Sequence, residues 1–122
     1  MGRLICCVLS LLICSTAFAK DFHLKGVLKT LTASPEITFD EKPHKYTALV
    51  LDKPISMNVY SEDTGGLVLI KNVSVIQVGW KASYRNYMNK KVSAVATECW
   101  DSVSGHVYTD VTCEISKIKI RK

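Results

Sequence analysis

Apolar and polar residues alternate along several short stretches, the pattern of β-strands that bury one face. In residues 22–29, for example, Phe22, Leu24 and Leu28 alternate with charged or polar neighbours. Asp52-Lys53-Pro54 separates two such stretches, and Lys71-Asn72 predicts a bend between two others. A change of phase after Ile115 predicts a bulge near residues 116–117. Further strands are predicted over residues 45–51, 55–59, 67–70, 73–78, 92–99 and 107–115.

One stretch follows a different period. Trp80, Tyr84, Tyr87 and Met88 are spaced as on one face of a short helix, and an aromatic stripe of this kind indicates a buried face. Five or six strands with one short helix before the last strand pair predict an all-β domain. The best match is a small OB-like barrel of five to six strands, and a β-sandwich is the alternative.

The N-terminal residues predict a cleavable signal peptide over residues 1–19. Arg3 precedes an apolar run over residues 4–13, and Ala17-Phe18-Ala19 has small residues where a signal peptidase cleaves. A membrane-spanning helix needs about 20 apolar residues, more than this run provides. We therefore expect a periplasmic or secreted protein without a membrane anchor, in which residues 20–122 form a single domain.

The cysteines support the same compartment. Three of the five, Cys6, Cys7 and Cys14, lie in the predicted signal peptide, which leaves Cys99 and Cys113 in the mature chain. A pair in an oxidising compartment predicts a structural disulfide, worth about 3 kcal/mol for a loop of this length. A redox-active pair and a metal-binding pair are the alternatives.

The charge of the chain says little about its class of function. The chain has 16 basic and 11 acidic residues, a net charge of +5, without a block of one sign. This balance suits a protein near anionic surfaces, but it is too mild and too scattered along the chain to predict nucleic-acid binding.

No catalytic constellation is recognisable in the sequence. Ser104, His106 and Asp110 lie within one loop, but a catalytic triad needs a buried, oriented base and an oxyanion hole. One histidine with one carboxylate is also too few ligands for a metal. We therefore expect no enzyme activity, no metal and no cofactor. The candidate binding residues are the polar and aromatic side chains of the last loop, with one neighbour: Trp100, His106, Tyr108, Asp110 and Tyr60.

These residues leave two classes of function open. The first is a binding or interaction module whose partner is a periplasmic protein or an envelope glycan. The second is a periplasmic immunity protein, or an inhibitor of a toxin or cell-wall hydrolase.

Four segments, in the same order, resemble the bacterial exported family catalogued as domain of unknown function 4431. They are the LDKPI, VIQV, KKVS and GHVYTDV segments, at residues 51–55, 75–78, 90–93 and 105–111. The resemblance implies an exported β domain and carries no known activity. The chain departs from the family's pattern at Ser56, where the family has a cysteine. The family's loop of three histidines is reduced in this chain to His106, which is followed by Val107 and Tyr108.

Overall fold

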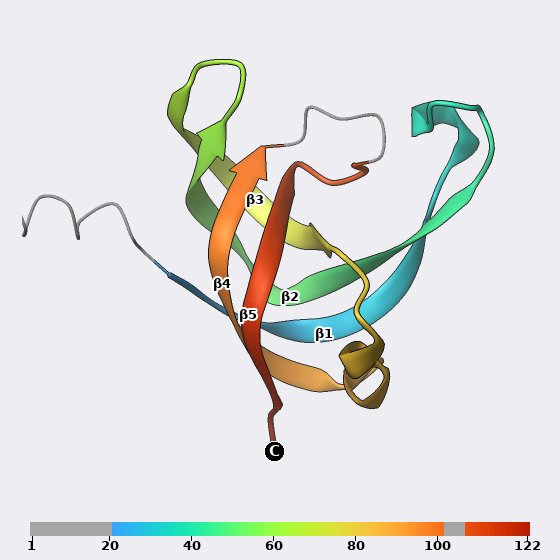
Figure 1. Ribbon diagram of the computed structural model, residues 1–122, viewed down its shortest axis with the longest axis vertical. Helices are drawn as coiled ribbons and strands as arrows, with labels where there is room; N and C mark the ends of the chain where they lie inside the picture. The colour runs from blue at the N-terminus through green and yellow to red at the C-terminus, as the bar shows by residue number, and fades with distance from the viewer. Residues whose placement is uncertain (1–20, 102–106) are drawn as a thin grey trace, which may run out of the picture.

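Five strands make up the protein, in a computed structural model that describes residues 21–101 and 107–122 (Figure 1). Two short 3-10 segments, η1 (Pro35–Ile37) and η2 (Ala82–Tyr87), lie in the connections between strands. The predicted signal peptide and His106 lie outside the described residues. The strands are β1 (Phe22–Ala33), β2 (His44–Ser61), β3 (Gly66–Val78), β4 (Lys91–Asp101) and β5 (Val111–Ile120).

The strands close into a barrel in the order β1-β2-β3-β5-β4, with β4 returning to β1. The β3–β5 pairing is parallel and short, from Ile76–Val78 to Val111–Cys113, whereas the long pairings are antiparallel. This is the strand order of the OB-type Greek-key barrel, and the predicted fold class is confirmed.

The barrel closes through β1, which pairs with β4 in its first half and with β2 in its second. The two halves meet at Gly26, whose Cα partners are Val92 of β4 and Leu51 of β2. A Cβ at this position would overlap the backbone carbonyl of Val50, so only glycine fits where the strands approach so closely.

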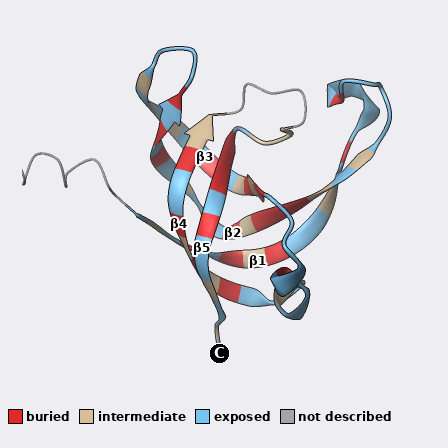
Figure 2. Ribbon diagram, in the orientation of Figure 1, coloured by how far each residue is buried: buried red, intermediate tan, exposed pale blue. Residues whose placement is uncertain are grey.

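The barrel interior holds the core. Buried and exposed residues alternate along much of the sheet, as the bands of Figure 2 show. Residues 47–49 of β2 and 111–113 of β5 are buried in succession, and residues 66–72 of β3 are not buried. The largest fully buried side chains are, apart from Ser61, aliphatic or sulfur-containing: Leu28, Leu49, Met57, Ile76, Val59, Val92, Val111 and Cys113. Tyr84 of η2 is part of this core.

Two expectations need correction. The stretches on either side of Asp52-Lys53-Pro54 belong to one strand, β2, because register shifts after Val50 and Ile55 absorb the irregularity without ending the pairing. The bend at Lys71-Asn72 likewise lies within β3, where Asn72 has a positive φ of 57°.

The predicted helix is a 3-10 turn, and its aromatic stripe is not buried throughout. Met88 pairs with Leu28 of β1, and the Asn89 N–H donates to the Leu28 carbonyl at 2.6 Å, so the chain is extended again by residue 88. This leaves six residues for a helical turn. Tyr84 is 3% exposed, whereas Trp80, placed before the turn, is 51% exposed.

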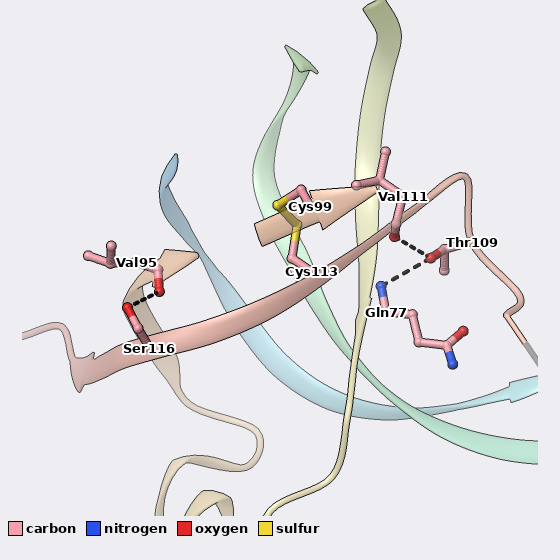
Figure 3. Close-up of a disulfide and its surroundings, with 7 residues drawn as sticks. All are labelled: Gln77, Val95, Cys99, Thr109, Val111, Cys113 and Ser116. Atoms are coloured by element: carbon pink, nitrogen blue, oxygen red, sulfur yellow. Dashed lines mark hydrogen bonds between the residues drawn. A yellow bond between two sulfur atoms is a disulfide. The ribbon is translucent and has the colours of Figure 1, made fainter. Parts of the chain in front are cut away.

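Cys99 and Cys113 form the predicted disulfide, with their Cα atoms 4.1 Å apart (Figure 3). They are direct cross-strand partners, and pairing continues beyond them through Asp101 and Val111. The strand pairing therefore extends two residues past the disulfide on each strand. The predicted bulge near residues 116–117 is confirmed, because Lys117 pairs with Val95 and Ile115 with Ala96.

Candidate functional site

A cleft of about 370 Å³ opens on the outer surface of the barrel, where the short parallel pairing of β3 and β5 ends. Beyond Val78, β3 turns away through Gly79 and Trp80, while β5 continues along β4. The space between them is not closed by strand pairing. We call it the aromatic cleft; its lining is Gln77, Gly79, Trp80, Lys81, Tyr84, Trp100, Thr112, Cys113, Glu114 and Ile115.

Three aromatic side chains line this cleft, two from the β3–β4 connection and one from β4. Trp80 and Tyr84 come from the β3–β4 connection, and their rings meet edge to face with centroids 6.2 Å apart. Trp100 comes from β4, beside its cross-strand partner Thr112 of β5. Tyr84 is anchored in the core, whereas Trp80 is half exposed, so a large aromatic surface remains open to a ligand.

Charged side chains of both signs, Lys81 and Glu114, line the same cleft. The Lys81 ammonium group donates to the Ile115 carbonyl at 3.2 Å and lies 6.0 Å from the centroid of the Tyr84 ring. Burial raises the pKa of Tyr84, and the negative charge of Glu114 raises it further. Tyr84 therefore stays a neutral phenol at physiological pH.

Glu114 lies opposite another acidic residue. Its direct cross-strand partner is Glu98 of β4, and both side chains are exposed. Like charges directly opposite each other in an antiparallel pair are destabilising. The rim of the aromatic cleft therefore carries a pair of carboxylates that the fold itself does not favour.

A second cleft, of about 260 Å³, lies between β3 and the segment that leads into β5. Its walls include Tyr46 of β2, residues 72–75 of β3, and Tyr108, Thr109 and Asp110. The rings of Tyr46 and Tyr108 are tilted against each other with centroids 5.3 Å apart. Burial raises the pKa of Tyr46. In OB-type barrels the β2–β3 face and the adjoining loops are where ligands bind.

Gln77 lies between the two clefts and fixes the wall they share. Its side-chain oxygen accepts from the Tyr108 N–H at 2.8 Å, and its own N–H donates to the Thr109 hydroxyl at 3.0 Å. That hydroxyl in turn donates to the Val111 carbonyl at 2.7 Å (Figure 3). The segment from residue 107 to 110 is thus held against β3.

Tyr108 also contacts the loop between β1 and β2. Its ring stacks on His44 with centroids 6.3 Å apart, and His44 lies 2.6 Å from the Asp40 carboxylate. The hydrogen bond from His44 lowers the pKa of Asp40. His44 therefore joins the β1–β2 loop to the segment before β5.

A third feature is an apolar patch on the outer face of the β2–β3 hairpin. Tyr60 of β2 and Leu67 of β3 are direct cross-strand partners, and Leu69 lies two residues further along. All three are about half exposed or more. Tyr60 also pairs with Trp100 through an isolated parallel bridge between β2 and β4. We call Tyr60, Leu67 and Leu69 the hairpin patch.

The candidate residues from the sequence are thus divided between neighbouring surfaces. Trp100 lines the aromatic cleft with Tyr60 beside it, and Tyr108 and Asp110 line the second cleft. Sequence reasoning missed Trp80, because its spacing from Tyr84 suggested a buried helical face. The signal that could have found it is Gly79, which ends the strand pattern directly before Trp80.

Two further features concern metal binding and membrane-spanning helices. In residues 21–101 and 107–122, no three histidine, cysteine, aspartate or glutamate side chains gather to hold a metal ion. The same residues contain no helix long and apolar enough to cross a membrane.

Comparison with known proteins identifies no relative. No family model matches the chain, and neither a curated protein nor a solved structure shows significant similarity to it. The resemblance to domain of unknown function 4431 therefore stays a prediction.

Proposed function

We propose that the protein is an exported binding module, periplasmic or secreted, that recognises an envelope glycan in the aromatic cleft. The observation that carries this proposal is the convergence of Trp80, Tyr84 and Trp100 on one open cleft. Small-ligand sites combine apolar and aromatic walls with a few convergent polar groups. Gln77, Lys81 and Glu114 supply such groups here.

The chemistry of the cleft favours a saccharide. A sugar ring presents an apolar face of C–H groups that stacks on an aromatic ring, and hydroxyl groups at its edge that pair with amide, ammonium and carboxylate groups. Trp80 and Trp100 offer the first kind of contact, and Gln77, Lys81 and Glu114 offer the second. Aminosugars and peptide amines of a cell-wall glycan would also pair with the carboxylates of Glu98 and Glu114.

The opposed Glu98 and Glu114 support a binding role for this surface. A like-charge pair reduces stability, so its presence fits a ligand that pairs with it rather than a structural role. The disulfide beside it holds β4 and β5 together at this point.

Co-sedimentation with isolated peptidoglycan sacculi tests the proposal. We expect the wild-type protein to sediment with sacculi and Trp100→Ala to bind at least tenfold more weakly, as truncated tryptophan contacts usually do. Phe39→Ala is the matched control, since Phe39 is 86% exposed in the β1–β2 loop, away from the cleft. Failure of the wild type to sediment, or equal losses in both variants, would reject the glycan proposal.

A protein partner is the second candidate, supported by the hairpin patch. Exposed Tyr60, Leu67 and Leu69 form an apolar surface next to Trp100, which suits an immunity protein or an inhibitor of a toxin or cell-wall hydrolase. Hydrolase activity on sacculi, measured with and without the protein, distinguishes this role. An inhibitor would slow a hydrolase, and Leu67→Asp would relieve the inhibition, whereas Trp80→Ala would leave it intact.

A further inference from the structure

Four lysines that are scattered along the sequence meet on one outer face of the barrel. Lys25 of β1 pairs with Ser93 of β4, and Ser93 pairs on its other side with Lys119 of β5. One row further along β5, Lys117 pairs with Val95, and on β4 Lys91 pairs with Val27 of β1. Cross-strand partners share a face, so all these side chains point away from the core. We call Lys25, Lys91, Lys117 and Lys119 the basic face.

The lysines of this face are exposed, and Lys91 and Lys25 interact at longer range with one carboxylate, that of Asp52. None of the four forms an ion pair with any described residue. The nearby carboxylate of Asp52 is already held by Arg121 in two contacts of 2.6 and 2.9 Å, and this pairing lowers the pKa of Asp52. Glu98 and Glu114 come next along the outer face of β4 and β5, beyond Val95 and Lys117. The face therefore keeps a net positive charge.

Opposite charges gather at the other end of the molecule. The β1–β2 loop carries Glu36, Asp40 and Glu41, and the β2–β3 turn carries Glu62 and Asp63. Figure 1 shows both loops at one end of the molecule. The C-terminus lies at the opposite end, together with the last residues of β5 and the first residues of β4. Lys42 offsets part of this acidic charge, so the charge is unevenly distributed rather than fully separated, and the basic face would still turn toward an anionic surface.

We propose that the basic face docks on an anionic lipid bilayer. Its charges form an array rather than a pocket: two strand spacings, roughly 10 Å, separate Lys25 from Lys119, and two residues, roughly 7 Å, separate Lys117 from Lys119. Such an array meets several separate headgroups at once. Between the lysines stand Ser93, Val95 and Val27, which are small or aliphatic, with the imidazole of His23 beside Val95. These outer rows of the described strands hold no tryptophan, tyrosine or phenylalanine to stack a base. These features favour lipid headgroups over a nucleic acid.

Docking in this orientation is compatible with the aromatic cleft. Along the outer face of the β4–β5 pair, the basic residues end at Lys117, opposite Val95, before Glu98 and Glu114 at the rim of the cleft. The cleft and the acidic loops would remain outside the contact with the bilayer. The proposal does not depend on what the cleft binds.

Flotation with lipid vesicles tests the proposal. We expect binding to mixed phosphatidylcholine–phosphatidylglycerol vesicles to exceed binding to pure phosphatidylcholine vesicles, and the excess to fall as salt is raised. Lys25→Gln with Lys119→Gln should lower the excess binding by about 25-fold, since each lysine near an anionic surface contributes about fivefold. Lys91→Gln with Lys117→Gln is an independent second variant.

The matched control is Lys42→Gln with Lys71→Gln, which removes the same charge from the β1–β2 loop and from β3. All variants share the same N-terminal residues, so differences between them report on the lysines alone. The proposal is wrong if the wild type shows no excess binding to the anionic vesicles, or if the control loses as much as the two test variants. Lysine-dependent binding to a DNA duplex without vesicle binding would also overturn it.

Discussion

The two halves of the outer face of β4 and β5 are built on the same backbone pairing but carry opposite chemistry. In the half near the C-terminus, Lys117 and Lys119 lie beside Val95 and Ser93. In the other half, Glu98 faces Glu114 and Trp100 faces Thr112. Both halves have buried apolar residues on the inner side, Val92, Ala94 and Ala96 in the first half and the two cysteines with Val111 in the second. The fold therefore constrains only the inner positions, and the outer positions are free to serve binding.

The two halves are also fastened differently. Near the C-terminus, β1 crosses from β4 to β2 at Gly26, so the barrel is closed by backbone packing on both sides. At the aromatic cleft, the parallel pairing of β3 with β5 covers only residues 76–78 and 111–113, and the disulfide holds β4 to β5. The half that is open to a ligand has fewer strand pairings, and the disulfide stabilises it.

Gly26→Ala should have the largest effect on the closed half. The added methyl group would overlap the Val50 carbonyl, which belongs to the backbone and cannot move without separating β1 from β2. We expect the variant to lose its cooperative thermal transition in circular dichroism. Gly79→Ala is the control and should melt like the wild type, because no atom lies within 4 Å of the place its new methyl group would take. Equal melting of both variants would mean that Gly26 does not close the barrel.

Removal of the disulfide tests the open half. Cys99→Ser with Cys113→Ser should lower the free energy of unfolding by about 3 kcal/mol, because the loop between them gains freedom in the unfolded chain. Denaturant titration measures this loss, and mass spectrometry of the unreduced protein checks the bond itself. We also expect weaker binding in the aromatic cleft, since Cys113 lines it. Unchanged stability would show that strand pairing alone holds this half together.

Glu114→Gln should have a small effect of opposite sign. It removes the repulsion with Glu98, so the free energy of unfolding should rise by about 0.5 kcal/mol while sacculus binding weakens. Lys117→Gln is the comparison from the basic half: it should leave sacculus binding unchanged. Weaker stability in Glu114→Gln would indicate that the carboxylate has a structural partner, against the binding role proposed for it.

Much of the fold could be predicted because strand alternation depends on local sequence. The period of two in β1 and the phase change after Ile115 both correspond to structure. The pattern failed at residues 80–88, where helical spacing of aromatic residues coincided with a turn too short for an α-helix. That length is set by the contact of Met88 with Leu28, a long-range pairing that spacing does not reveal.

The sites were harder to predict, because they depend on which strands become neighbours. Trp100 was a candidate, but its contact with Tyr60 and its meeting with Trp80 and Tyr84 are consequences of the β2–β4 bridge and the β3–β5 seam. Tyr108 and Asp110 belong to a different cleft because Gln77 holds their segment against β3. The basic face could not be predicted for the same reason. Lys25 and Lys119 lie on one face because both pair with Ser93 of β4.

The central claim is that the aromatic cleft binds the ligand, and nuclear magnetic resonance tests it most directly. Soluble peptidoglycan fragments would be titrated into the isotope-labelled protein, and the side-chain N–H signals of Trp80 and Trp100 would be followed. The account predicts saturable shifts of both indole signals, together with the backbone signals of Lys81 and Glu114. Shifts confined to Tyr46, Tyr108 and Asp110, or no saturable shift at either tryptophan, would contradict it.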